Sequence, residues 1–260
     1  MERNVITNMI LQNAMVLYGQ PKWTFGKNTC NTYEVFVEYF RTESGNLLPA
    51  WPILEIIEQD EAMTMLFSTT LLWEAVQRTI EISRNANSHL HLSLNLLPRF
   101  AESENFMQQV EDCLAKTGFD PKRLQFEVSE LQDLNDEGAA HLNALRDKYG
   151  ISLVMGNFGT KHTNMPLLRK VHFDGLELDK SYSQFIPGDD MTAKIIIAIQ
   201  QMADTTDMFV CAKGIENQEQ FEFYEEIGIY KGQGPMIGDP MPLDELEKFI
   251  KRYALPIGHA

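Results

Sequence analysis

Short apolar runs alternate with amphipathic segments along most of this chain, and this alternation restricts the fold more than any other feature. Strands that are apolar on both faces are typical of parallel sheets covered by helices. The segment 15–25 precedes them and is typical of one further strand and a turn. The strand candidates are Tyr33–Phe40, Leu90–Leu96, Leu124–Ser129, Ile151–Met155, Gly175–Leu178 and Met208–Ala212.

The segments between these strands have helical periodicity and recognisable ends. A helix that follows Ser103 is expected to stop at Gly118. Asp136 is expected to cap the next helix, which ends at Gly150, and the last helix begins near Leu243. A regular alternation of this length favours a (β/α)8 TIM-barrel-like architecture, with an open doubly wound sheet as the alternative.

Domain organisation follows from the even spread of glycine and proline, since no linker or low-complexity tract divides the chain. We therefore expect a single domain over residues 1–260. No G-x-G-x-x-G or G-K-[ST] motif follows a strand, and this weakens the nucleotide-binding form of the open sheet.

Charge and cysteine content exclude several classes of protein. Acidic residues outnumber basic residues by 37 to 22, and a formal charge of −15 repels nucleic acid and anionic membranes, so neither is expected as a partner. No apolar run approaches the roughly 20 residues of a membrane helix, and no signal-peptide pattern is present. Three dispersed cysteines are typical of reduced thiols, and we expect a cytoplasmic protein.

Polar residues lie on or directly after the predicted strands. In a barrel, the carboxyl ends of the strands converge on one site. Carboxylate and amide oxygens suit Mg²⁺ or Mn²⁺ better than zinc. A zinc hypothesis based on His89 and His91 lacks a third ligand at suitable spacing. The candidate residues are Glu34, Asn95, Glu127, Asn157, Glu177, Asp179, Lys213 and Gln233.

Eight short motifs, in the same order along the chain, resemble those of the EAL domain family, whose active members hydrolyse cyclic di-GMP. The resemblance extends roughly over residues 17–250 and implies a (β/α)8 barrel. The motifs are Tyr18-Gly19-Gln20-Pro21, Glu34 to Glu38, Asn95-Leu96-Leu97, Glu127 to Glu130, Gly156 to Lys161, Glu177-Leu178-Asp179, Lys213 to Glu216, and Gln233-Gly234.

The resemblance also implies roles for individual positions. Active members are similar to two-metal hydrolases, in which a pair of divalent ions activates water. The positions of the metal ligands are Glu34, Asn95, Glu127 and Asn157, the catalytic positions are Gly156, Glu177 and Lys213, and the positions that contact the nucleotide are Gln20, Glu38, Asp179 and Gln233.

Several of these positions have lost the residue that the chemistry requires. Gly156 and Asn157 stand where the family has two aspartates, and neither supplies a carboxylate. Glu177 replaces a lysine and Lys213 replaces an acidic ligand, so an ion pair is retained with its partners exchanged if the two face each other. Glu38 replaces the arginine that grips a phosphate.

These losses predict a catalytically inactive regulatory protein that binds another protein, such as a transcription regulator or a signalling protein. The enterobacterial anti-flagellar EAL-like regulator has a similar Gly-Asn replacement in this one motif. No cofactor is expected, or at most weakly bound Mg²⁺ or Mn²⁺, and cyclic di-GMP binding is expected to be weak or absent. The alternatives are a cyclic di-GMP receptor, a weak metal-dependent phosphodiesterase, and an unrelated barrel enzyme.

Four large apolar residues bear on whether the chain pairs with a second copy. Trp51, Phe67, Leu71 and Trp73 either pack a core helix pair or belong to the paired-subunit surface that many EAL domains use. Core packing is favoured for most of them, and a homodimer stays open. Met165 either packs in the core or lines an adaptable recognition surface.

Overall fold

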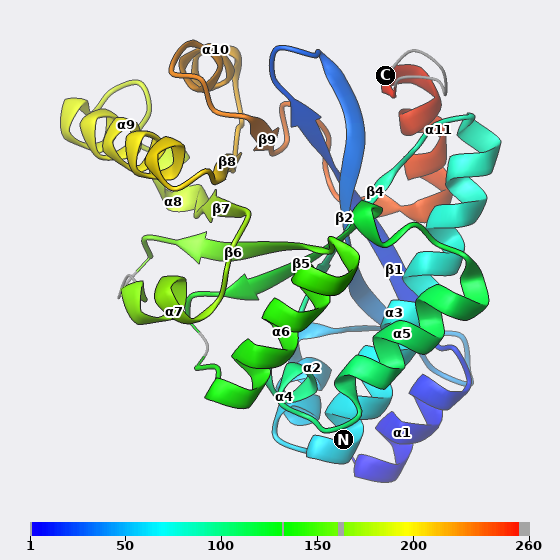
Figure 1. Cartoon of the computed structure of the whole chain (residues 1–260). Coiled ribbons are helices and arrows are strands. Elements are labelled where there is room, and N and C mark those ends of the chain that lie inside the picture. Colours follow the sequence, from blue (N-terminus) through cyan, green and yellow to red (C-terminus); the bar gives the residue numbers. More distant parts are fainter. Residues whose placement is uncertain (1, 132, 161–163, 255–260) are drawn as a thin grey trace.

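A computed structural model describes residues 2–131, 133–160 and 164–254 of the chain. Lys161, the last residue of the altered Gly-Asn motif, lies outside these residues. Within them, eight strands close into a barrel with helices on its outer side (Figure 1). The expected (β/α)8-like barrel is therefore confirmed.

Seven of the barrel strands run parallel, in the order β2, β4, β5, β6, β7, β8, β9. β1 closes the ring because it pairs antiparallel with both β2 and β9. Two short strands pair outside the ring: β3 (Leu47–Pro49) with β2, and β10 (Met241–Pro242) with β1. The barrel strands are β1 (Met15–Thr24), β2 (Thr29–Arg41), β4 (His91–Asn95), β5 (Leu124–Ser129), β6 (Ser152–Phe158), β7 (Gly175–Leu178), β8 (Phe209–Lys213) and β9 (Lys231–Gln233).

Helices follow the strands and cover the outside of the barrel (Figure 1). A 3₁₀ turn over Pro121–Arg123 leads into β5. Among the described residues, no helix combines the length and apolar character needed to span a bilayer. The helices are α1 (Arg3–Leu11), α2 (Trp51–Glu58), α3 (Glu61–Ala86), α4 (Pro98–Ala101), α5 (Phe106–Thr117), α6 (Asp136–Tyr149), α7 (Met165–Lys170), α8 (Lys180–Ser183), α9 (Asp190–Thr205), α10 (Gln218–Glu226) and α11 (Leu243–Tyr253).

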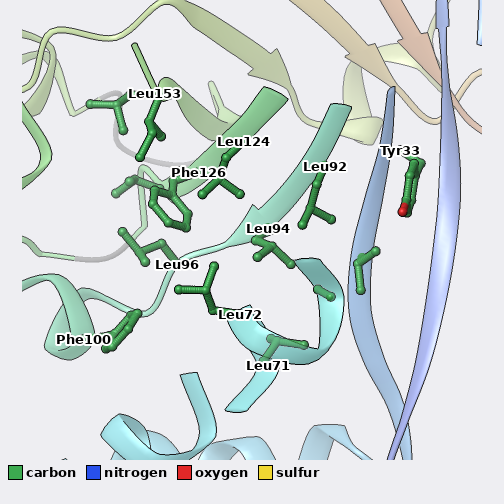
Figure 2. Close-up of a cluster of buried hydrophobic side chains, with 14 of the residues drawn as sticks. Tyr33, Leu71, Leu72, Leu92, Leu94, Leu96, Phe100, Leu124, Phe126 and Leu153 are labelled. Carbon is green, nitrogen blue, oxygen red and sulfur yellow. The ribbon is translucent and has the colours of Figure 1, made fainter. Parts of the chain in front are cut away.

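The hydrophobic core lies between the barrel strands and the surrounding helices. Leu71 and Leu72 of α3 approach Leu94 of β4, and Phe126 of β5 lies in the same cluster (Figure 2). Phe67 and Leu71 are buried, as core packing predicts, but Trp51 at the start of α2 is 72% exposed. Core packing therefore does not account for Trp51, because α2 buries the side that carries Ile53 and Ile57.

Strand β6 continues beyond its predicted end at Met155. Gly156 and Asn157 lie within the strand rather than after it. The pairing of β6 with β7 shifts register between Met155 and Phe158, and Asn157 has a left-handed φ of 57°. Asparagine tolerates this conformation better than most residues, and such an irregularity re-aims side chains near a barrel rim.

The amino-terminal cap of α6 also differs from the sequence expectation. Asn135, not Asp136, occupies the cap position, and its Oδ1 accepts the Gly138 N–H at 2.8 Å. Asp136 lies in the first turn of the helix and forms an ion pair with Lys170 at 2.6 Å. A cap bond satisfies a backbone donor that has no partner within the helix.

Asn135→Ala is expected to lower the free energy of unfolding by about 1 kcal/mol, because the cap bond is lost. Asp136→Ala is the matched control and should cost much less, since its ion pair is exposed. Urea denaturation of both variants measures the difference. A larger loss for Asp136→Ala would show that the cap has been assigned to the wrong residue.

Candidate functional site

Three carboxylates and a lysine meet at the carboxyl ends of the parallel strands. Glu34 comes from β2, Glu127 from β5, Glu177 from β7 and Lys213 from β8. The Nζ of Lys213 lies 3.1 Å from Oε2 of Glu34, 3.3 Å from Oε2 of Glu127 and 2.7 Å from Oε2 of Glu177. Glu177 and Lys213 therefore face each other, and the lysine contacts all three acidic side chains.

A second lysine, Lys22 of β1, reaches the same cluster from deeper inside the barrel, on the side away from the carboxyl ends of the parallel strands. Its side chain is completely buried, and its Nζ contacts Oε1 of Glu127 and Oε1 of Glu177. Ser93 lies 3.5 Å from the same Nζ and also donates a hydrogen bond to Glu127. Glu127 and Glu177 are thus each held between two ammonium groups.

The sequence motif that contains Gln20 ends at Pro21, so it does not single out Lys22 as a site residue. A signal was available, since alternate residues of a strand share a face and Lys22 lies two positions after Gln20. The depth at which Lys22 lies is harder to predict. β1 runs antiparallel to its neighbours, so the later residues of β1 lie deeper in the barrel, farther from its mouth.

Both carboxylate oxygens of Glu34 also accept hydrogen bonds from side-chain amides. Asn95 donates from Nδ2 to Oε1 of Glu34 at 2.5 Å, and Gln233 donates from Nε2 to Oε2 at 3.0 Å. The structure therefore brings together Glu34, Asn95, Glu127 and Gln233, as expected for residues at the ends of neighbouring strands. They form one hydrogen-bonded cluster with Lys213.

Gly156 and Asn157 contribute differently. The Nδ2 of Asn157 donates to Oγ of Ser129 at 3.1 Å, so its amide is engaged by the neighbouring strand. Gly156 contributes only backbone, and its carbonyl oxygen accepts the Glu130 N–H at 3.0 Å. Neither residue offers a carboxylate to the cluster.

The three other positions implied in nucleotide contact lie on β1, on β2 and directly after β7. Gln20 donates from Nε2 to the carbonyl oxygen of Gly238 at 3.1 Å. Asp179 caps α8, accepting the Ser181 N–H at 2.9 Å. Glu38 is half-buried on β2. Gln20 and Asp179 thus make structural hydrogen bonds at the mouth of the barrel. Glu38 adds a negative charge there.

Burial and ion pairing set the charge of the cluster. Burial disfavours the charged form of Lys22 and of Lys213, but the adjoining carboxylates outweigh it, and the pKa of each lysine is raised. Burial opposes ionisation of Glu127, yet both lysines hold its pKa well below the usual range. Burial and the neighbouring Glu127 raise the pKa of Glu177 to about 7.

This donor set does not fit a dinuclear metal centre. Divalent ions such as Mg²⁺ require several oxygen ligands that are free to face the metal. Here the carboxylates face two ammonium groups, Gly156 lacks a side chain, and the Asn157 amide is turned to Ser129. Among the described residues, no group of three or more His, Cys, Asp or Glu side chains has the geometry of a metal site.

Lys231 lies one layer deeper in the barrel, beside Cys211 of β8. It is 9% exposed, and its Nζ lies 5.2 Å from the Phe209 ring centre and 5.7 Å from that of Tyr230. Burial, followed by the positive charge of Lys22, lowers its pKa from 10.5 to about 8. An amine with a depressed pKa binds fewer protons in the folded chain than in the unfolded chain.

The free energy of unfolding is therefore expected to rise with pH between 8 and 10.5, relative to a Lys231→Met variant. The largest slope for one group is about 1.4 kcal/mol per pH unit. Urea denaturation of both proteins across this window measures the difference. The exposed Lys27→Met is the control and should track the wild type; a flat difference for Lys231→Met would contradict the expectation.

Comparison with known proteins places the chain in a family. The sequence profile of the EAL domain matches residues 3–240. The chain is 25% identical over 189 residues to the probable cyclic di-GMP phosphodiesterase PdeN of Escherichia coli K12, an overlap of 72% of this chain and 36% of that protein. It is 26% identical over 234 residues to the cyclic di-GMP phosphodiesterase PA2567 of Pseudomonas aeruginosa, an overlap that covers 90% of this chain and 39% of that protein.

The fold agrees with solved structures. The EAL enzyme Bd1971, in a form bound to cAMP and cyclic di-GMP, superposes with a TM-score of 0.85 at 22% identity, covering 95% of this chain and 67% of that one. The chain spans well under half the length of the two curated relatives. On the match over nearly all of its length, the chain belongs to the EAL domain family.

Proposed function

We propose that this chain is a catalytically inactive EAL-domain protein that acts as a regulatory, protein-binding module in, or derived from, cyclic di-GMP signalling. One observation carries the proposal: the ammonium groups of Lys22 and Lys213 contact the carboxylates of Glu34, Glu127 and Glu177. The resemblance implies that Glu34 and Glu127 would face divalent cations in an active two-metal member of the family. Here the positive charges beside the carboxylates belong to the lysine side chains of the protein itself.

The physical argument against hydrolysis concerns both charge and substrate. A lysine neutralises a carboxylate, but it supplies no open coordination position and lowers no water pKa. Lys213 also repels a divalent ion that approaches Glu34 or Glu127. Glu38 adds a negative charge where the resemblance implies a phosphate clamp, and this repels a dianionic nucleotide.

A protein without this chemistry retains a folded barrel with surfaces for contact. The relatives with similar sequences are named as cyclic di-GMP phosphodiesterases, which supports a role connected with that signalling system. A transcription regulator or another signalling protein is the kind of partner that we propose. The regulation would then depend on binding alone.

Hydrolysis of cyclic di-GMP in the presence of Mg²⁺ or Mn²⁺ tests the loss of catalysis. PA2567, named as a cyclic di-GMP phosphodiesterase, is assayed in parallel as the positive control. We expect linear dinucleotide from the control and none above background from this chain. Metal-dependent turnover by this chain would overturn the proposal. Affinity capture from the native host then addresses the binding role, for which a stoichiometric protein partner is the expected result.

A cyclic di-GMP receptor or weak phosphodiesterase is the second candidate. It is favoured by the preserved cluster of Glu34, Asn95 and Gln233, in which Glu34 accepts both amides. Calorimetry with cyclic di-GMP, with and without Mn²⁺, separates the two candidates. Micromolar binding without turnover would favour a receptor, and no heat of binding is expected from the leading proposal.

A further inference from the structure

Lys231 is a buried amine for which the described residues supply no counter-charge. It is the first residue of β9 and is 9% exposed. Within the described part of the chain, no hydrogen bond or ion pair engages its Nζ, whereas the buried Lys22 contacts two carboxylates. A buried charge normally has a partner of opposite sign, because its removal from water is costly. Lys231 therefore lacks the contact that keeps a buried lysine in its ammonium form.

Two aromatic rings and a threonine lie next to this amine. The rings are those of Phe209 and Tyr230, which offer no acceptor to an ammonium group other than their faces. Thr24 of β1 pairs directly with Lys231 across the antiparallel β1–β9 ladder. Directly opposed residues of such a ladder have their side chains on the same face of the sheet. The amine thus lies beside an apolar wall and a hydroxyl group that is able to donate a hydrogen bond.

The largest charge effect on Lys231 is repulsion. After burial, the positive charge of Lys22 is the next cause that lowers its pKa, and the opposing effects of Cys211, Glu177 and Glu127 are each smaller. An ammonium group at this place is therefore repelled by Lys22, whereas an anion at the same place is attracted by it. The neutral amine that burial and repulsion favour carries a lone pair, and it is the nucleophilic form of lysine.

The other titratable groups beside Lys231 are uncharged at neutral pH. Burial raises the pKa of the Cys30 thiol on β2 and of the Cys211 thiol on β8 to about 12. Desolvation, followed by the positive charge of Lys231, lowers the pKa of His91 on β4 to about 4. None of these groups therefore provides a negative charge that would hold a proton on Lys231.

We infer that Lys231 is a site of reversible carbamate formation by carbon dioxide. The lone pair of the neutral amine forms a bond to the carbon of CO₂ and one N–H proton passes to water, so that amine and CO₂ give a carbamate anion and H⁺. The reaction needs no oxidant, reductant or further reactant. It replaces a group that Lys22 repels with one that Lys22 attracts, and Thr24 is placed to donate a hydrogen bond to a carbamate oxygen.

The narrow access to Lys231 selects CO₂ among carbonyl electrophiles. Only 9% of the residue is exposed, and two aromatic rings lie over its Nζ. A small, linear and uncharged molecule reaches such an amine, whereas a bulky aldehyde or acyl donor does not. The site lies at the amino-terminal end of β9, away from the cluster around Glu34, so the inference does not depend on the proposed function.

Chemical trapping on the full chain tests the inference. The protein is equilibrated with ¹³C-labelled bicarbonate and CO₂ near pH 8 and treated with triethyloxonium, which ethylates a carbamate oxygen and makes the adduct permanent. Peptide mass spectrometry then locates the label. We expect the adduct at Lys231 to exceed that at the exposed Lys27 by at least about 10-fold, because water favours the unreactive ammonium form of an exposed lysine.

Carbon-13 NMR of the untrapped protein gives an independent readout. The wild type and the matched control Lys27→Met should show a carbamate signal that Lys231→Met lacks, and thermal unfolding confirms that both variants are folded. The peptide map of the wild type tests the inference even if Lys231→Met does not fold. Equal adducts at Lys231 and Lys27, an adduct at Lys231 only after denaturation in urea, or a carbamate signal that persists in folded Lys231→Met would each overturn the inference.

Discussion

Lys22→Met is expected to lower the free energy of unfolding by about 3–5 kcal/mol, because it leaves two buried carboxylates without one of their counter-charges. Glu127 and Glu177 are both essentially inaccessible to water, and each contacts the Lys22 ammonium group. Water cannot replace the lost cation at this depth. Urea denaturation at neutral pH gives the change in free energy directly.

Lys251→Met is the matched control for that substitution. Lys251 forms an ion pair with Glu247 at 2.7 Å across one turn of α11, with its own side chain 47% exposed. Exposed pairs of this kind contribute less than about 1 kcal/mol. Adding Glu177→Leu to Lys22→Met should recover at least about 1 kcal/mol, since one of the two buried carboxylates that lost the Lys22 ammonium group is removed with it. Equal losses of unfolding free energy for Lys22→Met and Lys251→Met would show that the buried ion pairs of Lys22 stabilise the fold no more than an exposed ion pair does.

Restoring the family residues at five positions is not expected to create a metal site by itself. A metal site is expected only when Lys22 is changed as well. The five changes are Gly156→Asp, Asn157→Asp, Glu177→Lys, Lys213→Glu and Glu38→Arg. With Lys22 retained, the new lysine at position 177 faces a second ammonium group in the same buried space. The variant with Lys22→Ile as a sixth change should bind Mn²⁺ at least about 100-fold more tightly than the five-position variant.

The backbone has room for these changes. A Cβ at Gly156 meets nothing nearer than the Val128 carbonyl oxygen at 3.9 Å, and Asn157 occupies a conformation that aspartate tolerates. Calorimetric titration with Mn²⁺ measures the difference, and thermal unfolding confirms that both variants are folded. Equal Mn²⁺ affinity of the two variants would show that Lys22 does not exclude the metal.

The barrel was predictable from sequence because parallel strands covered on both faces are nearly uniform apolar runs. The polar residues that interrupt those runs, such as Glu34 and Glu127, were recognisable for the same reason. Lys22 was not, because an isolated lysine in a ten-residue strand does not disclose which way that strand runs. Its role depends on the antiparallel closure of β1, which is a property of the tertiary structure.

Local competition between neighbouring residues explains the other differences. Asn135 and Asp136 are both good capping residues, and only the entry of the chain into α6 decides between them. Gly156 and Asn157 are poor strand formers, yet pairing with β5 keeps Gly156 in the sheet. Trp51 is exposed because α2 buries its other side. Of these outcomes, the retention of Gly156 in the sheet depends on β5, which is distant from it in sequence.

The central claim is that lysine ammonium groups, and not divalent ions, balance the carboxylates of this site. Crystals soaked in Mn²⁺ and measured at the manganese absorption edge test it most directly. The account predicts no anomalous peak among Glu34, Glu127 and Glu177, with Lys22 and Lys213 still in contact with them. A pair of peaks bridged by those carboxylates, with Lys213 displaced, would contradict it.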